Sequence, residues 1–379
     1  DSATGASIMA LIRELNADVL KLDRSLVHRL DIDLSDRAVV RAVTALAHAF
    51  DMRVVAEGIE TPSQHQSVVQ IGCDWGQGFL FGPARSAKEM AVYLVEAGSH
   101  VSEPLRKPNE PGGVVLIGQK GKVIYKKAFG MANLELGVSM KEEMVFNIAS
   151  LTKQFTAVAV LQLVEQGKLT LADDITKYLP DYPTGGQPLT VEHLLTHTAG
   201  IPGSAPEAIT KLQGERRLIK LPEIINTFKT RPLDFTPGTK MVYSNNGYML
   251  LGAIIEKVSG MSYAEYLEKN LFKPAGMTET HFGDDYIITK NRAASYIYSR
   301  AESRFLNALN GKVELAYSAG AIQSTAGDMF KWNQALNASK LIKKESLAKA
   351  HREHMLPDGK RTFYGYGWFI GNLQGSPLV

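Results

Sequence analysis

The sequence predicts an α/β protein made of two differently built parts: a partial barrel-like segment over residues 1–98, and a helical cluster with an antiparallel sheet over residues 113–379. Three observations predict this fold class. Short apolar runs alternate with helical patterns near the N-terminus, which is typical of parallel βα units. A stretch rich in Pro, Gly and charge, residues 99–112, then reads as a linker. A hairpin pattern and a series of helical patterns follow it.

In the first part, residues 19–22 and 54–56 are apolar runs that predict strands, and residues 37–50 carry apolar side chains at helical spacing between them. A strand, a helix and a second strand in this order imply parallel pairing. In barrels of this kind, functional groups gather at the carboxyl ends of the strands. The polar residues at such positions are Asp23, Glu57 and Gln77.

The second part begins with two strand-like runs, residues 114–117 and 123–128, joined by the glycine-containing turn 118–121, which predicts a β-hairpin. The turn superficially resembles a phosphate-binding loop, but its spacing is wrong and Val123 stands where Ser or Thr is needed. Residues 170–240 show helical patterns and loops, and residues 363–370 return to strand character.

The most informative pattern is Ser150-Leu151-Thr152-Lys153. If Ser150 opens the helix that the following apolar residues predict, Lys153 lies one turn along, beside the hydroxyl. A partly desolvated lysine near a helix N-terminus has a lowered pKa and can accept the serine proton near neutral pH. Alone, however, Ser-x-x-Lys is also typical of an ordinary helix with a serine cap and a solvated lysine.

Tyr243-Ser244-Asn245, further along the chain, supplies the groups that an activated serine needs next. A tyrosine near such a lysine can hold a lowered pKa and pass the proton to the leaving group, and an asparagine can orient the substrate amide or the lysine. The sequence contains no Gly-x-Ser-x-Gly elbow, which disfavours an α/β-hydrolase fold with a Ser-His-Asp triad.

Several ordered blocks resemble the β-lactamase-related serine hydrolases, which include class C β-lactamases, penicillin-binding DD-peptidases and similar esterases. These blocks are residues 146–157, 167–169, 194–200, 237–238, 243–245 and 324–329. The resemblance covers residues 113–379. It implies that Ser150 is the acylated nucleophile, that Lys153 and Tyr243 handle the proton and that Asn245 orients the substrate, with no cofactor.

The third motif of that family, Lys-Thr-Gly or His-x-Gly on a late strand, is expected just beyond Val379. Its strand also supplies one of the two oxyanion-hole amides. Removing one oxyanion donor typically costs about a hundred- to a thousandfold in rate. We therefore expect weak activity or none from this chain by itself.

Residues near the N-terminus resemble the second half of an EAL domain, a TIM-barrel-like phosphodiesterase for cyclic di-GMP; the blocks are 20–25, 56–61 and 72–80. The resemblance implies that Asp1 matches the second aspartate of a paired motif, Lys21 the active-site lysine, Glu57 the late glutamate and Gln77 the late glutamine. A complete EAL domain uses Mg²⁺ or Mn²⁺, but most of its ligands precede the position of Asp1. Because the chemistry needs both ions, we expect no phosphodiesterase activity.

Composition excludes several other classes. The chain has 379 residues, 45% hydrophobic and 21% charged, with a net charge of +3 and no long Lys/Arg block, which does not favour nucleic-acid binding. The single cysteine, Cys73, forms no intrachain disulfide. No apolar run suggests a membrane span, and no signal-peptide pattern occurs. His193 and His197 have zinc-ligand spacing, but no third ligand is evident, and packing beside the active site is favoured.

Three functional hypotheses follow. The first is a serine hydrolase that forms an acyl-enzyme on an ester, peptide or β-lactam carbonyl of a small-molecule or peptide substrate. The second, from a different class, is a non-catalytic EAL-derived segment that binds cyclic di-GMP. The third is an inactive fusion of two incomplete domains. A cytoplasmic location follows only if the fusion is natural, and the localisation is otherwise unknown.

Overall fold

The computed structural model describes residues 19–30, 33–49, 52–81, 108–299, 302–308, 312–373 and 376–379. The chain divides into two compact units, Asp1–Tyr93 and Leu94–Val379. Asp1 and residues 99–107 of the predicted linker lie outside the described residues. The domain boundaries expected after residue 98 and before residue 113 therefore stay predictions.

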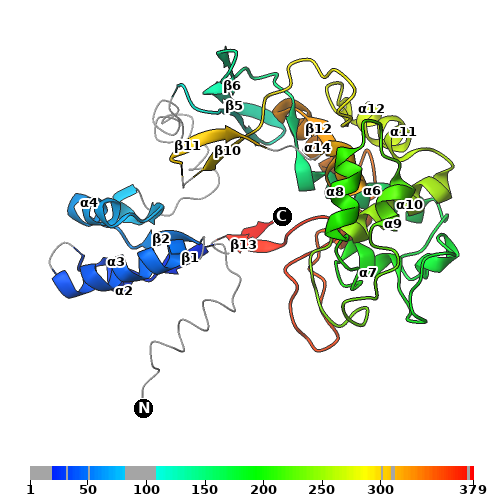
Figure 1. Ribbon diagram of the computed structural model, residues 1–379, viewed down its shortest axis with the longest axis horizontal. Coiled ribbons are helices and arrows are strands. Elements are labelled where there is room, and N and C mark those ends of the chain that lie inside the picture. The colour runs from blue at the N-terminus through cyan, green and yellow to red at the C-terminus, as the bar shows by residue number, and fades with distance from the viewer. Residues whose placement is uncertain are drawn as a thin grey trace. The chain divides into compact units, whose positions relative to one another are not determined.

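The smaller unit contains a three-stranded parallel sheet covered by helices (Figure 1). Its elements are β1 (Val19–Leu22), α2 (Arg24–Val27), α3 (Leu34–Ala49), β2 (Arg53–Glu57), α4 (Pro62–Ile71), β3 (Trp75–Gln77) and the 3₁₀ turn η1 (Phe79–Phe81). Alternate residues of the first two strands, Leu22, Val54 and Ala56, share one core with Val40 of α3 and Val68 of α4. The predicted strand–helix–strand order is therefore confirmed.

Local sequence signals explain where α4 begins and ends. The Thr61 side chain accepts a hydrogen bond from the Gln64 backbone N–H, and the Gln64 side chain accepts one from the Thr61 backbone N–H in return. Gly72, with φ +93°, ends the helix in a left-handed conformation that glycine adopts without strain. The chain then turns directly into β3.

The larger unit contains several short antiparallel pairings. Its strands are β4 (Gly113–Gln119), β5 (Lys122–Phe129), β6 (Met131–Asn133), β7 (Val138–Ser139), β8 (Phe146–Asn147), β9 (His281–Phe282), β10 (Tyr296–Ser299), β11 (Arg304–Asn307), β12 (Ile322–Ser324), β13 (Gly371–Leu373) and β14 (Ser376–Leu378). β4 and β5 form the predicted hairpin. Its turn residues Lys120 and Gly121 both have positive φ, which identifies a tight hairpin turn and not a phosphate loop.

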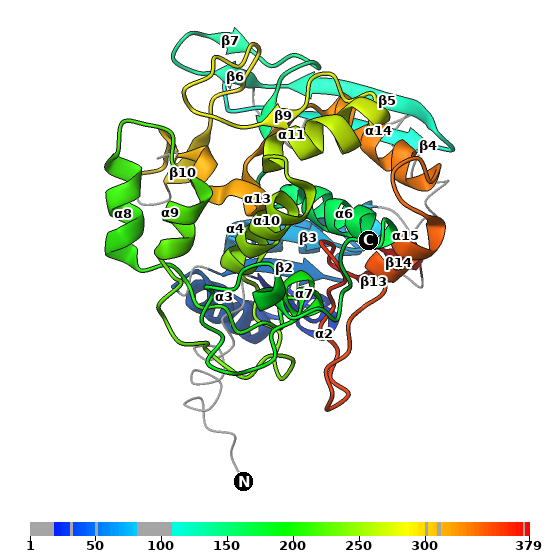
Figure 2. The same cartoon turned by 90° about the vertical axis from the view of Figure 1, so that its right-hand side faces the viewer.

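The helices of the larger unit are α6 (Thr152–Glu165), α7 (Val191–Leu195), α8 (Pro206–Gly214), α9 (Leu221–Asn226), α10 (Asn245–Ser259), α11 (Tyr263–Leu267), α12 (Lys273–Ala275), α13 (Tyr317–Gly320), α14 (Ala326–Asn337) and α15 (Lys344–Ala350). Short 3₁₀ or π segments join them, namely η2 (Ala149–Leu151), η3 (Ile175–Lys177), η4 (Glu268–Phe272) and η5 (Val313–Ala316). α6 and α10 lie side by side near the centre of the unit (Figure 2).

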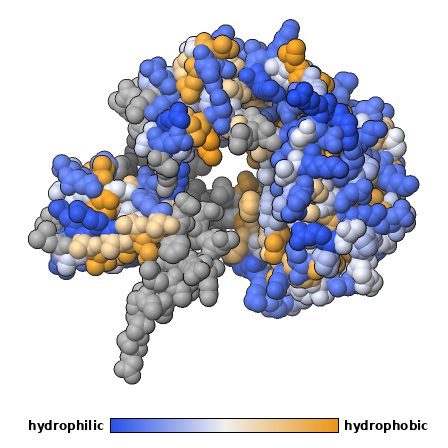
Figure 3. Space-filling view, in the orientation of Figure 1, coloured by the Kyte–Doolittle hydropathy of each residue, from blue (hydrophilic) through white to orange (hydrophobic). Residues whose placement is uncertain are grey.

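The apolar core of the larger unit surrounds α6, which is buried along most of its length. Phe155 stacks on Trp332 of α14 with ring centroids 4.0 Å apart. The visible outer face of the helical region carries mainly hydrophilic side chains (Figure 3). Burial of α6 on several sides gives its first turn, which begins the site described below, a rigid support.

The strand predicted at residues 363–370 is wrong. This segment turns irregularly, with an isolated bridge between Tyr364 and Phe369, and strand structure begins only at Gly371. Two close approaches explain the difference. A Cβ at Gly365 would lie 2.0 Å from the Ala350 carbonyl oxygen, and one at Gly367 would lie 2.8 Å from that of Lys153. The segment is shaped by packing on α15 and α6, which apolar periodicity cannot reveal.

Candidate active site

Ser150 lies at the surface, in a tight turn held on both sides by β12. The Ile148 backbone N–H donates to the Ile322 carbonyl oxygen at 3.0 Å, and the Ile322 N–H donates to Thr152 Oγ1 at 3.1 Å. Ala149 has φ +46°, a strained value for alanine. Ser150 belongs to the 3₁₀ turn η2, and the regular helix α6 starts at Thr152. The prediction that Ser150 is the first residue of the helix is therefore wrong, because the short turn η2 precedes it.

Lys153 lies beneath Ser150 and is completely buried. Its Nζ is 3.2 Å from Ser150 Oγ, 2.8 Å from Asn245 Oδ1 and 2.8 Å from the Ala319 carbonyl oxygen. Burial lowers the pKa of Lys153 from 10.5 to about 7, because the charged form loses its hydration. The amine is therefore close to half neutral at physiological pH.

The Tyr243-Ser244-Asn245 segment immediately precedes and begins α10. Ser244 caps this helix by accepting the Gly247 N–H, which places Asn245 at its first position with the side-chain amide against Lys153. The structure therefore brings Ser150, Lys153 and Asn245 together through direct contacts.

Tyr243 completes the cluster, with its ring centroid 4.6 Å from Lys153 Nζ and its hydroxyl near enough to Ser150 for the serine side chain to influence its pKa. Burial raises the pKa of Tyr243, and the Ser150 side chain opposes this only in part. The expected lowering of this pKa is wrong in direction. Because the pKa of Lys153 is about 7, this lysine is neutral in the alkaline range where a tyrosine ionises and supplies no positive charge to stabilise a phenolate, so desolvation of the tyrosine dominates.

Of two further contacts to the cluster, one was not predicted from the sequence and the other was predicted only as packing beside the active site. The Ala319 carbonyl is a backbone group, so no side-chain pattern reports it. His197, in the middle of the 194–200 block, packs its ring on Tyr243 with centroids 4.3 Å apart, which agrees with the predicted packing beside the active site. His197 Nδ1 accepts the Ser244 backbone N–H, and no group of three or more His, Cys, Asp or Glu residues in the described part of the chain is arranged for a metal ion. These observations do not support the zinc interpretation.

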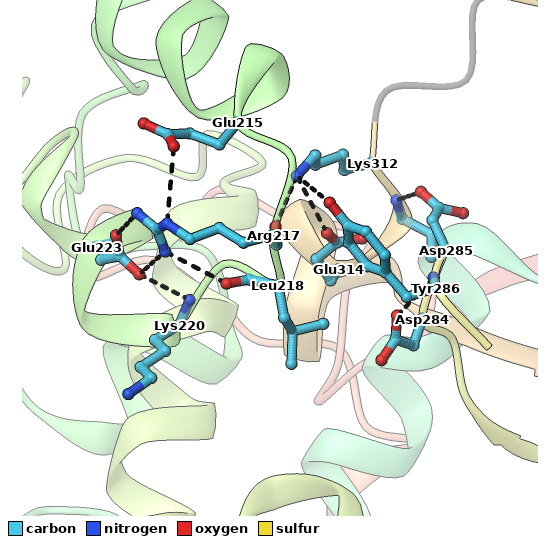
Figure 4. A network of polar contacts seen from close by, with 11 residues as sticks. Glu215, Arg217, Leu218, Lys220, Glu223, Asp284, Asp285, Tyr286, Lys312 and Glu314 are labelled. Carbon is cyan, nitrogen blue, oxygen red and sulfur yellow. Dashed lines mark hydrogen bonds and ion pairs between the residues drawn. The ribbon is translucent and has the colours of Figure 1, made fainter.

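A charged network borders the segment that leads to Ala319 (Figure 4). Lys312 Nζ donates to the Arg217 carbonyl oxygen at 2.8 Å but lies 3.8 Å from Glu314 Oε1. Glu314 is 1% exposed, and neither of its carboxylate oxygens has a hydrogen-bond partner among the described residues. The ion pair to Lys312 is therefore too long to replace the lost hydration fully. Burial raises the pKa of Glu314.

In the smaller unit, Asp23 directly follows β1, and Glu57 and Gln77 end β2 and β3, as predicted. Lys21 Nζ forms an ion pair with Glu57 Oε1 at 3.0 Å, and Glu57 faces Gln77 in the β2–β3 register. Asp1 lies outside the described residues. The described part of this unit has no cluster of metal-ligating side chains, and the Glu57 carboxylate is paired with the Lys21 ammonium group. The Mg²⁺ or Mn²⁺ of a complete EAL domain does not fit these residues, and we derive no phosphodiester chemistry here.

Comparison with known proteins identifies both parts. Residues 98–379 match the Beta-lactamase family, and residues 1–84 match the EAL domain. The chain is 32% identical to penicillin-binding protein 4* of Bacillus subtilis over 294 residues, which cover 73% of this chain and 62% of that protein.

No described helix is both long and apolar enough to cross a membrane.

Solved structures agree with this assignment. The octameric penicillin-binding protein homologue from Pyrococcus abyssi is 30% identical, with a TM-score of 0.62 over 77% of this chain and 67% of the other. The D-amino acid amidase from Ochrobactrum anthropi, 23% identical with a TM-score of 0.63 over 77% and 84%, shares the fold. The predicted α/β architecture, an EAL segment followed by a helical cluster with antiparallel sheet, is thus confirmed, and the chain belongs to the β-lactamase family of serine hydrolases.

Proposed function

We propose that this chain forms an acyl-enzyme at Ser150, on an ester, peptide or β-lactam carbonyl. The observation that carries the proposal is the hydrogen-bonding environment of Lys153 Nζ. Two of its neighbours, Asn245 Oδ1 and the Ala319 carbonyl oxygen, accept hydrogen bonds and cannot donate them. A neutral amine directs its two hydrogens at these oxygens and leaves its lone pair for the Ser150 hydroxyl, 3.2 Å away.

The proposed reaction follows from this arrangement. Lys153 takes the hydroxyl proton as Ser150 Oγ attacks the substrate carbonyl carbon. Tyr243, adjacent to both Lys153 and Ser150, gives its hydroxyl proton to the leaving group as the substrate bond breaks, and Lys153 returns the serine proton to Tyr243. Water then hydrolyses the ester to Ser150. Asn245 holds Lys153 in place. The likeness to penicillin-binding proteins supports a peptide or β-lactam carbonyl as the first substrates to test.

The test is the intact mass of the chain after incubation with a fluorophosphonate and, separately, with a penicillin. We expect one adduct per chain, absent from Ser150→Ala and retained in Ser339→Ala, which changes an exposed serine away from the cluster. An adduct that persists in Ser150→Ala would refute the assignment of the nucleophile. A folded wild-type chain that forms no adduct with either reagent would refute the proposed activity of this chain.

An alternative proposal concerns the smaller unit, in which Glu57 and Gln77 end neighbouring strands and Lys21, inside β1, forms an ion pair with Glu57. Such positions are where ligands of parallel α/β folds bind, which supports binding of cyclic di-GMP without catalysis. Titration calorimetry with the dinucleotide tests it. Binding heat that Lys21→Ala removes would support a signalling role, and a flat titration of the wild-type chain would exclude it.

A further inference from the structure

His197 occupies an unusual position two residues beyond the end of α7. Its side chain is 2% exposed, and its backbone has φ +59°, in the left-handed region that is strained for a residue with a Cβ. Strain of this kind persists only where surrounding structure holds the residue in place, and it concentrates at functional sites. The contacts of His197 indicate what the position does.

Both residues that flank Tyr243 are hydrogen-bonded to His197. The Val242 backbone N–H donates to the His197 carbonyl oxygen at 2.9 Å, and the Ser244 backbone N–H donates to His197 Nδ1 at 3.0 Å. The imidazole also packs on the Tyr243 ring, with centroids 4.3 Å apart. A single residue therefore fixes Tyr243 through the backbone on either side and through the ring.

The choice of histidine is explained by one of its two ring nitrogens. Nδ1 accepts a hydrogen bond, so the neutral ring carries its proton on Nε2. Nε2 is buried and has no hydrogen-bond partner among the described residues, which costs free energy. The ring is also surrounded by Tyr248 and Tyr364, with centroids 4.9 and 4.7 Å away. A phenylalanine would fill this aromatic environment without the unpaired N–H, so the feature that distinguishes histidine here is acceptance by Nδ1.

We propose that His197 is a positioning residue of this site, which aligns the Tyr243 hydroxyl with Ser150 and the Asn245 amide with Lys153 by holding the backbone between them. This inference rests on the proposed acyl-enzyme chemistry. It extends that chemistry by assigning the placement of Tyr243 to a residue that touches neither Ser150 nor the substrate carbonyl.

Two substitutions separate the hydrogen bond from the ring packing. His197→Phe keeps an aromatic ring but removes the acceptor. His197→Asn places Oδ1 where Nδ1 lies along the side chain, and asparagine tolerates positive φ. We expect His197→Phe to slow fluorophosphonate labelling of Ser150 about 100-fold, the size of effect that small misplacements of catalytic groups produce. His197→Asn should recover most of that loss.

Rates are normalised to the folded fraction, measured by thermal unfolding, and His351→Phe controls for loss of a half-buried imidazole elsewhere. The effect of His197→Phe should be clearly smaller in a Tyr243→Phe background, because only the alignment of the Asn245 amide with Lys153 then remains to be lost. Labelling of His197→Phe at the wild-type rate, or an equal loss in both backgrounds, would overturn the proposal. If the wild-type chain is labelled and His197→Phe is labelled at the same rate, the role of His197 is refuted but the proposed function stands. If the wild-type chain is not labelled, the proposed function itself is refuted.

If His197→Phe does not fold, the wild-type protein still tests the proposal. Nitrogen-15 NMR of labelled histidines, with the His197 signal assigned through His197→Asn, distinguishes the two neutral tautomers. We expect Nδ1 to be unprotonated and hydrogen-bonded, with the proton on Nε2. A proton on Nδ1 would overturn the proposal because that nitrogen could not then accept the Ser244 N–H.

Discussion

Replacing Lys153 by methionine should stabilise the protein at acidic and neutral pH while abolishing acylation of Ser150. Methionine fills a similar unbranched volume in the completely buried space and carries no charge. The native lysine is destabilising in its charged form because burial removes the hydration of the ammonium group. The substitution removes this cost together with the proposed base.

The magnitude follows from the pKa of Lys153, which falls from 10.5 to about 7 on folding. Between these values the native state binds fewer protons than the unfolded state, so the free energy of unfolding rises with pH by about 1.36 kcal/mol per pH unit. The burial cost is complete below pH 7 and is lost progressively as the pH approaches 10.5. From pH 6 to pH 9, the wild-type protein should gain about 3 kcal/mol relative to Lys153→Met.

Urea unfolding of both proteins at pH 6, 7, 8 and 9 measures this difference. A Trp75→Phe background confines the fluorescence signal to Trp332 and Trp368, which are buried in the larger unit. Lys153→Met also loses the hydrogen bonds to Asn245 and Ala319, but that loss does not depend on pH and cancels in the comparison. Lys168→Met controls for removal of an exposed lysine charge.

A stability difference between Lys153→Met and wild type that stays constant from pH 6 to pH 9 would refute the reasoning. It would mean that Lys153 stays protonated throughout this range, so that burial has not lowered its pKa to near neutrality. The same result would remove the physical basis for proton acceptance from Ser150. Labelling of the wild type by a fluorophosphonate should then show no increase through pH 7, which is an independent reading of the same protonation.

Three further predictions concern neighbouring residues. Asn245→Asp puts a carboxylate at the position 2.8 Å from Lys153 Nζ, which should raise the pKa of Lys153. The pH midpoint of Ser150 labelling should therefore move upward. At pH 7, labelling should slow about tenfold for each pH unit that the midpoint moves. Glu314→Gln should raise the melting temperature more at pH 8 than at pH 4. The raised pKa of Glu314 means that its buried carboxylate destabilises the folded protein only at pH values where the group is ionised. An equal rise in melting temperature at pH 4 and pH 8 would contradict this. Gly367 has φ +92°, and a Cβ added there would lie 2.8 Å from the Lys153 carbonyl oxygen. Gly367→Ala should therefore lower the free energy of unfolding in urea by about 1–3 kcal/mol. No change in that free energy would show that the contact relaxes freely.

The sequence predicted those parts of the site that depend on short spacings. The three-residue interval from Ser150 to Lys153 places the two side chains together because the 3₁₀ turn at Ser150 leads directly into α6, and the Tyr243-Ser244-Asn245 segment provides its own helix cap. The Ala319 carbonyl reaches Lys153 across 166 positions of sequence, and nothing in the local pattern encodes that contact. The direction in which the pKa of Tyr243 moves was also mispredicted, because it depends on the extent of burial of the whole cluster.

Strain and buried polarity occur together at this site. Ala149, His197 and Tyr317 all have positive φ, and they lie beside Ser150, Tyr243 and the Ala319 segment respectively. Each would be more stable in an ordinary conformation, and Lys153 would be more stable in water. These unfavourable conformations persist because the surrounding core of α6 and α10 holds the Ser150 turn, Tyr243 and the Ala319 carbonyl in one arrangement around the Lys153 amine. Stability is given up at the residues whose placement the proposed chemistry needs, and the pH-dependent difference in unfolding free energy between the wild type and Lys153→Met measures the cost of burying Lys153.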